Sequence, residues 1–143
     1  MKRSGLILLG GILVSLLPVN ASGLIANQLE SKQIKKANPV QVYYFHLTRR
    51  CVTCQTVEKV AEDAVKENFP EAMLKGDITF KSINLEEKEN KDLAKKLKVS
   101  GQTLLIVNGN EKIDITDKGF LYAVKEPDKL KTEIKNTVQK YLK

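Results

Sequence analysis

Residues 40–68 decide the fold, and they read VQVYYFHLTRRCVTCQTVEKVAEDAVKEN. Residues 40–47 form a largely apolar run rich in β-branched and aromatic side chains, which predicts a strand that is covered on both faces. Residues 52–68 place apolar side chains at helical spacing, which predicts an amphipathic helix that begins at or just after Cys51. Between the two stands the dithiol Cys51-Val52-Thr53-Cys54, the one plausible chemical centre in the sequence.

The segments downstream continue the alternation of strands and helices. Residues 78–85 and 103–107 are predicted strands, with a short helix over residues 90–98 that Asn90 can cap. Asn108-Gly109 is a hairpin signal, and Ile113 and Ile115 alternate with polar residues in the strand predicted after it.

The last quarter of the sequence predicts a turn and a closing helix. Lys118-Gly119 is interpreted as the turn, and Pro127 suits the first position of a helix that buries Leu130, Ile134 and Val138. A strand–helix–strand crossover is normally parallel, whereas a hairpin is antiparallel. We therefore expect an α/β fold with a mixed central sheet of about four strands flanked by helices.

The N-terminal segment predicts export. Lys2 and Arg3 precede an apolar run over residues 6–17, and Val19-Asn20-Ala21 offers the small residues that a signal peptidase recognises. The run is shorter than the ~20 residues that a bilayer-spanning helix needs, although an uncleaved anchor is the alternative. We expect a signal peptide over residues 1–21 and one domain over residues 22–143, with an additional N-terminal helix over residues 24–36. The predicted location is periplasmic or secreted, without stable membrane insertion after cleavage.

The charge pattern argues against nucleic acid as a partner. The formal net charge is +7, and removal of Lys2 and Arg3 with the signal peptide leaves +5 (7 − 2). The lysines are scattered among acidic residues, and the few aromatic residues are not interleaved with them. We expect a monomer whose partners are protein or small-molecule thiols and disulfides.

The two cysteines of the sequence stand three residues apart. An exported chain reaches an oxidising compartment, in which disulfides persist. A bridge across two intervening residues removes little entropy from the unfolded chain, so it stabilises a fold poorly. The spacing therefore favours a reversible redox couple over a structural disulfide.

An apolar strand followed by C-x-x-C and an amphipathic helix resembles the active-site unit of the thioredoxin family. Residues 82–85 (SINL) and 99–109 (VSGQTLLIVNG) are similar to the family's later strand–helix–strand–hairpin course. The resemblance covers roughly residues 40–143. It implies a thioredoxin-like fold and thiol–disulfide oxidoreductase activity, with no cofactor other than the redox-active disulfide.

Three positions depart from the family pattern. Gln102 stands before Thr103, where the family usually has a cis-proline that faces the dithiol. A cis bond before a residue other than proline costs ~3 kcal/mol, so we expect Gln102 to be trans. Phe45 holds the place of the family's buried acid, and Arg50 replaces the Trp that usually precedes the first cysteine. These departures indicate a divergent member with an unusual partner.

Roles for the site residues follow from their positions. A cysteine at a helix N-terminus meets free amide N–H groups, so Cys51 is the expected nucleophile and Cys54 the resolving thiol. Arg49 and Arg50 stabilise the thiolate, dock an acidic partner, or simply form a solvated pair in the loop; the sequence leaves the three open. His46, Gln102 and Thr103 are possible accessory residues. Glu58, one helical turn beyond Cys54, is either a base or a surface acid.

Two other functions fit the same residues. The thiolates of Cys51 and Cys54 with His46 could hold a soft ion such as Cu(I) or Zn²⁺, although structural zinc usually takes four protein ligands. A non-catalytic interaction domain is the second alternative, and the substitution at Gln102 is its main support. The leading hypothesis remains an exported thiol–disulfide oxidoreductase.

Overall fold

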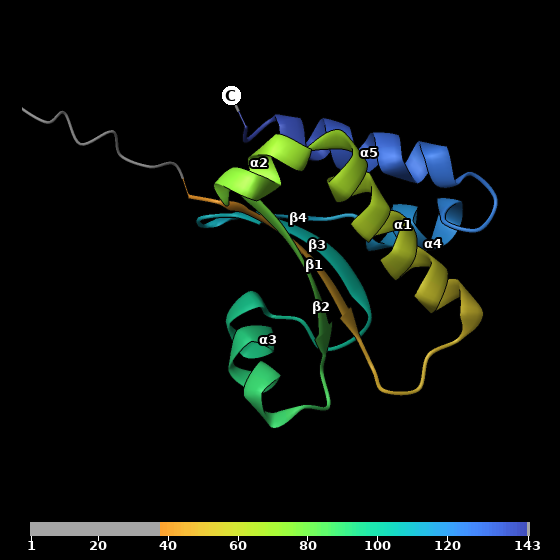
Figure 1. Cartoon of the computed structure of the whole chain (residues 1–143). Helices are drawn as coiled ribbons and strands as arrows, with labels where there is room; N and C mark the ends of the chain where they lie inside the picture. Colours follow the sequence, from red (N-terminus) through yellow and green to blue (C-terminus); the bar gives the residue numbers. More distant parts are fainter. Residues whose placement is uncertain (1–37, 143) are drawn as a thin grey trace, which may run out of the picture. The chain divides into compact units, whose positions relative to one another are not determined.

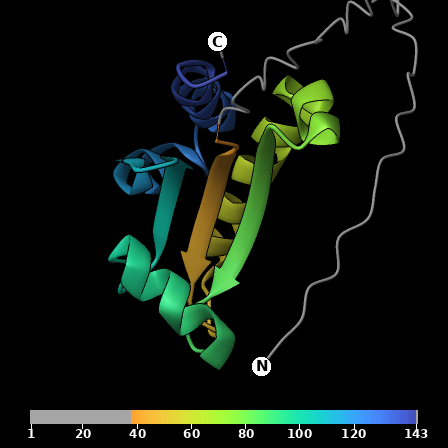
Figure 2. The ribbon, with the colours of Figure 1, turned by 90° about the vertical axis from the view of Figure 1, so that its left-hand side faces the viewer.

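The computed structural model describes residues 38–142, and its centre is a four-stranded mixed sheet. The strands are β1 (Val40–His46), β2 (Ile78–Asn84), β3 (Thr103–Asn108) and β4 (Glu111–Asp114), and their order in the sheet is β2-β1-β3-β4 (Figures 1 and 2). β1 pairs in parallel with β2 and antiparallel with β3, and β3 pairs antiparallel with β4. The predicted mixed sheet is confirmed. The predicted signal peptide and the helix over residues 24–36 lie outside the described residues.

Helices cover both faces of the sheet (Figure 1). On one face lie α1 (Val52–Asn68), α2 (Pro70–Lys75), α4 (Thr116–Tyr122) and α5 (Pro127–Gln139). On the other lies α3 (Lys91–Leu97), which follows a single 3₁₀ turn at Lys88–Asn90. None of the helices within residues 38–142 has both the length and the apolar character that a bilayer crossing requires.

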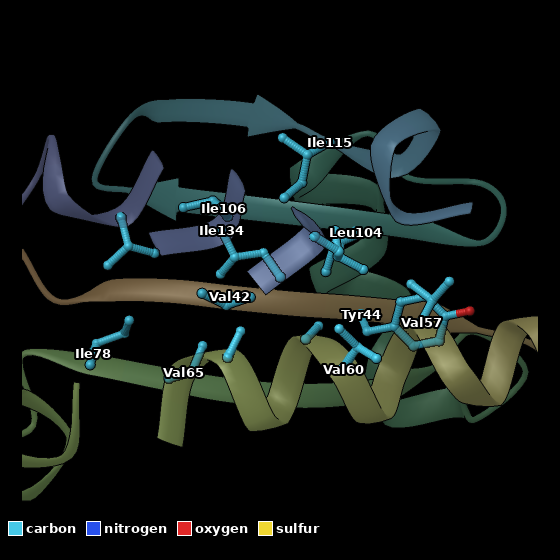
Figure 3. Close-up of a cluster of buried hydrophobic side chains, with 14 of the residues drawn as sticks. Val42, Tyr44, Val57, Val60, Val65, Ile78, Leu104, Ile106, Ile115 and Ile134 are labelled. Atoms are coloured by element: carbon cyan, nitrogen blue, oxygen red, sulfur yellow. The ribbon is translucent and has the colours of Figure 1, made fainter. Parts of the chain in front are cut away.

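Alternate residues of β1 build two separate cores. Val40, Val42 and Tyr44 are fully buried against α1 and α5, in the cluster shown in Figure 3. Tyr43 and Phe45 point to the opposite face and pack with Leu97 of α3 and with alternate residues of β3. Because successive side chains of a strand point to opposite faces, an apolar run along β1 supplies both cores at once.

The two short helices α2 and α4 were not predicted from the sequence. Pro70 follows the end of α1 and opens α2 at the first helical position, where the N–H that proline lacks needs no partner. Ile115 was expected in the last strand. It instead precedes α4 as its N-cap residue, because β4 ends at Asp114. The Asp114 carboxylate accepts hydrogen bonds from the Thr116 N–H at 2.9 Å and from its hydroxyl at 2.5 Å, which turns the chain into the helix.

The turn predicted at Lys118-Gly119 is wrong, since both residues lie inside α4. Gly119 is buried, and a Cβ atom there would lie 3.2 Å from a methyl of Val57 and 3.4 Å from one of Leu104. The glycine therefore lets α4 approach α1 and β3 closely. Asn90 also differs from expectation: its amide donates to the Asn84 carbonyl and the Glu87 carboxylate, and it makes no side-chain cap for α3.

Candidate functional site

The dithiol lies at the end of β1, where the chain passes into α1. Cys51 is the N-cap residue of α1 in an extended conformation (φ −79°, ψ 167°), and the helix begins at Val52 as predicted. The loop before it is held by the segment after β2: the Thr48 N–H donates to the Glu86 carboxylate at 2.7 Å, and the Asn84 amide donates to the Thr48 hydroxyl at 3.0 Å. These two hydrogen bonds tie the loop that leads to Cys51 to the end of β2 and to the turn after it.

The two cysteines are close together and differ in exposure. Their Sγ atoms are 2.9 Å apart as free thiols, with Cys51 exposed and Cys54 only 3% exposed. The hydrogen bond with the Cys54 thiol, followed by those from the N–H groups of Cys54 and Thr53, lowers the pKa of Cys51. Burial, together with the hydrogen bond to Cys51, raises the pKa of Cys54. Cys51 is therefore the sulfur that loses its proton more easily, and Cys54 is the one that holds its proton to higher pH.

The two arginines of the loop differ in their surroundings. Arg50 forms an ion pair with Glu58 of α1, and both side chains are about one fifth exposed. Arg49 is exposed. The pKa of Cys51 is lowered by the thiol of Cys54 and by backbone amides, with neither guanidinium among the causes. Glu58, which the sequence left open as a base or a surface acid, is the ion-pair partner of Arg50.

Gln102 lies in contact with Cys54. The Cys54 thiol donates to its Oε1 at 3.0 Å, across a separation of 48 residues in the sequence. No peptide bond among residues 38–142 is cis, so Gln102 is trans, as expected. The hydroxyl of Thr103, the first residue of β3, donates to the Gly101 carbonyl at 3.0 Å in the loop just before it. Of these two accessory candidates, Gln102 is the one that touches a sulfur.

Tyr44 is a site residue that the sequence analysis missed. Phe45, which the resemblance places at a buried acid, points to the α3 face and away from α1. Its neighbour Tyr44 points toward α1 instead and is fully buried. Burial, followed by the charges that Cys54 and Glu58 carry when ionised and by a hydrogen-bond contribution from Cys54, raises the pKa of Tyr44. The alternation of faces along β1 is the signal that would have found it, once α1 is assigned to the Val42 face.

His46 is buried beside Tyr44 and does not complete a metal site. Its ring stacks on that of Tyr44 with centroids 6.1 Å apart, and its Nδ1–H donates to the Leu47 carbonyl at 2.9 Å. Within residues 38–142, no three or more His, Cys, Asp or Glu side chains are gathered so that they could hold a metal ion. The soft-metal alternative requires His46 together with both thiols, and that grouping is not formed.

Comparison with known proteins adds little to this geometry. No family model matches the sequence, and no curated protein matches it. A solved structure described as "Structure of a malarial protein" is similar with a TM-score of 0.39 and 19% identity, covering 62% of this chain and 97% of that one. A similarity at this level supports no inference about function.

Proposed function

We propose that this chain is an exported, periplasmic or secreted thiol–disulfide oxidoreductase, and a divergent member of the thioredoxin-like proteins. The observation that carries the proposal is the asymmetric sulfur pair: an exposed Cys51 with a lowered pKa, 2.9 Å from a buried Cys54 with a raised pKa. The placement of the pair between β1 and the first turn of α1 supports the same assignment. Only a thiolate attacks a disulfide, and the lowered pKa of Cys51 favours that form of the accessible sulfur.

The reaction needs no group beyond the two sulfurs. The Cys51 thiolate attacks one sulfur of a partner disulfide, forms a mixed disulfide and releases the partner's other sulfur as a thiolate. Cys54 loses its proton to water and attacks the Cys51 Sγ, which closes the Cys51–Cys54 disulfide and releases the second partner sulfur. Two electrons pass from the dithiol to the partner. The reverse sequence oxidises a partner dithiol.

The replacement Cys54→Ser tests this function. It removes the sulfur that resolves the mixed disulfide, so partners are expected to accumulate in covalent complexes through Cys51. Non-reducing electrophoresis of the exported fraction followed by mass spectrometry measures them. Cys51→Ser is the matched control, and it is expected to trap nothing because the remaining cysteine is 3% exposed.

Two results would contradict the proposal. If Cys54→Ser forms no covalent complexes beyond those seen with Cys51→Ser, the proposed exchange function is wrong. If a partner binds the double variant Cys51→Ser/Cys54→Ser as tightly as the native chain, the interaction-domain alternative replaces it. Metal that co-purifies stoichiometrically under reducing conditions, and is lost in His46→Ala, would favour the soft-metal alternative.

Apolar surface beside the nucleophile supports a protein as the partner. Val52, between the two cysteines, is 78% exposed, and Val124, between α4 and α5, is 58% exposed. Both line an open groove of about 510 Å³ that follows one side of α1 as far as Asp63, with Pro127 on its other side. The eleven helical steps from Val52 to Asp63 span ~16 Å, which is room for about five residues of extended chain. A small thiol would use only a fraction of this length.

The replacement Val124→Glu is expected to slow exchange with a protein disulfide about threefold to fivefold, because a charge on the groove wall disfavours apolar contact. The rate with oxidised glutathione should stay unchanged, since that molecule does not need the groove. Stopped-flow kinetics with both substrates measure the ratio. Leu74→Glu, at a residue of α2 that is 89% exposed, is the matched control and should affect neither rate. Equal loss with both substrates would contradict a protein-specific groove.

A further inference from the structure

Tyr44 carries a buried hydroxyl without a partner. The residue is fully buried in the core beneath α1, and its hydroxyl oxygen makes no hydrogen bond. Its ring belongs to the same buried cluster as Val57, which follows Cys54 by three residues, and Figure 3 shows its oxygen directed outward from the centre of that cluster. Buried polar groups in native proteins are nearly always paired, so a hydroxyl left unpaired beside a reactive thiol indicates a partner in another state of the site.

The groups that face this hydroxyl identify that state. Cys54, Glu58 and Arg50 are the groups whose charges act on Tyr44, and the His46 ring stacks against its ring. Glu58 and Arg50 are already joined to each other. The single proton of the Cys54 thiol goes to Gln102. The Tyr44 hydroxyl, although Cys54 contributes to raising its pKa, makes no hydrogen bond to that sulfur in the dithiol form. A Cys54 thiolate, in contrast, has lost its proton and accepts hydrogen bonds.

We propose that the Tyr44 hydroxyl donates a hydrogen bond to the Cys54 thiolate during disulfide exchange, and is thus the positioning residue for the resolving step. This inference rests on the proposed function. When Cys54 attacks the mixed disulfide at Cys51, the Cys54–Cys51 bond forms, the Cys51–partner bond breaks, and the partner leaves as a thiolate with the electron pair. The proton of Cys54 has gone to water beforehand. Tyr44 keeps its own proton throughout, because burial raises its pKa.

The test uses the reduced full-length chain with one equivalent of 5,5′-dithiobis(2-nitrobenzoate). Attack by Cys51 releases one coloured thiolate, and resolution by Cys54 releases the second, so the two steps appear as two phases. Tyr44→Phe is expected to slow the second phase about threefold to tenfold and to leave the first unchanged, since it removes one hydrogen bond to an anion. The pH midpoint of the second phase should move to higher pH, because the Cys54 thiolate is then less stabilised.

Tyr43→Phe is the matched control. Tyr43 is the adjacent residue of β1, and its side chain packs on the α3 face, away from the sulfurs. It should change neither phase. The thermal midpoint of reduced Tyr44→Phe should be no lower than that of the native chain, since the hydroxyl has no partner to lose. That result separates a role in resolution from a role in packing.

The outcomes distinguish this inference from the function on which it rests. If the native chain shows two phases and Tyr44→Phe leaves the rate of the second phase unchanged, the role of Tyr44 is overturned. The oxidoreductase function is then unaffected. Equal slowing by Tyr43→Phe overturns it as well. A native chain that releases no second thiolate overturns both proposals.

Discussion

Replacement of Cys54 by alanine is expected to raise the pKa of Cys51 and to slow its alkylation at pH 6 by about tenfold or more. The hydrogen bond with the Cys54 thiol is the largest cause of the lowered pKa of Cys51. Without it, Cys51 holds its proton to higher pH, and its thiolate fraction on the acid side falls about tenfold for each unit of pKa. Rates of reaction with iodoacetamide between pH 4 and pH 10 measure the shift. Cys54→Ser should shift the pH profile of alkylation less than Cys54→Ala does, since a serine hydroxyl can still donate a hydrogen bond to the Cys51 thiolate.

Arg50→Ala is the control that separates the thiol from the guanidinium. Arg50 is paired with Glu58, so its removal should leave the alkylation profile of Cys51 close to that of the native chain. A shift in Arg50→Ala as large as in Cys54→Ala would show that the arginine governs the thiolate. An unshifted profile in Cys54→Ala would show that the backbone amides of α1 are sufficient by themselves.

The sequence predicts the central unit well because its signals are local. Along residues 40–68 the apolar pattern changes from a continuous run to helical spacing at the dithiol, and α1 spans the predicted residues. The N-cap position of Cys51 follows from that change alone. The parallel pairing of β1 with β2 and the antiparallel hairpin of β3 with β4 follow from the connections between them.

The contacts that complete the site join residues far apart in the sequence, and local sequence patterns do not show which of these residues meet. The contact of Gln102 with Cys54 joins residues 48 apart in the sequence, and only the resemblance drew attention to that position. The choice between Tyr44 and Phe45 depends on which face of β1 receives α1. Both residues are fully buried, so the polarity of the strand gives no indication. The ion pair of Arg50 with Glu58 likewise depends on how the loop before α1 folds, which the sequence pattern does not show.

Gly119 illustrates how one residue type can carry two meanings. Glycine after lysine favours a turn, because glycine adopts unusual backbone angles easily. In the structure Gly119 lies within a helix, and because it has no side chain α4 can contact Val57 and Leu104. A close approach between two helices leaves no periodic signal in the sequence, so α4 was missed.

Replacement of Gly119 by leucine is accordingly expected to lower the free energy of unfolding by about 2 kcal/mol, roughly a thirtyfold change in the unfolding equilibrium. Even the first added atom would lie 3.2 Å from Val57, and the remaining atoms would have to displace α4 from α1 and β3. Overpacking of this kind costs about 1–3 kcal/mol, and the better helix propensity of leucine offsets somewhat under 1 kcal/mol of it. Urea unfolding of the reduced chain measures the difference.

Gly119→Ala separates the side-chain clash from the backbone preference. Its single added carbon is tight against Val57, yet alanine favours a helix over glycine by about 1 kcal/mol, so the two effects should nearly cancel. A large loss in Gly119→Ala would mean that the backbone of residue 119 needs glycine itself, as a turn would. Native stability in Gly119→Leu would mean that α4 does not pack against Val57. Because Val57 follows Cys54 by one turn of α1, the same contact fixes the helix that positions the dithiol.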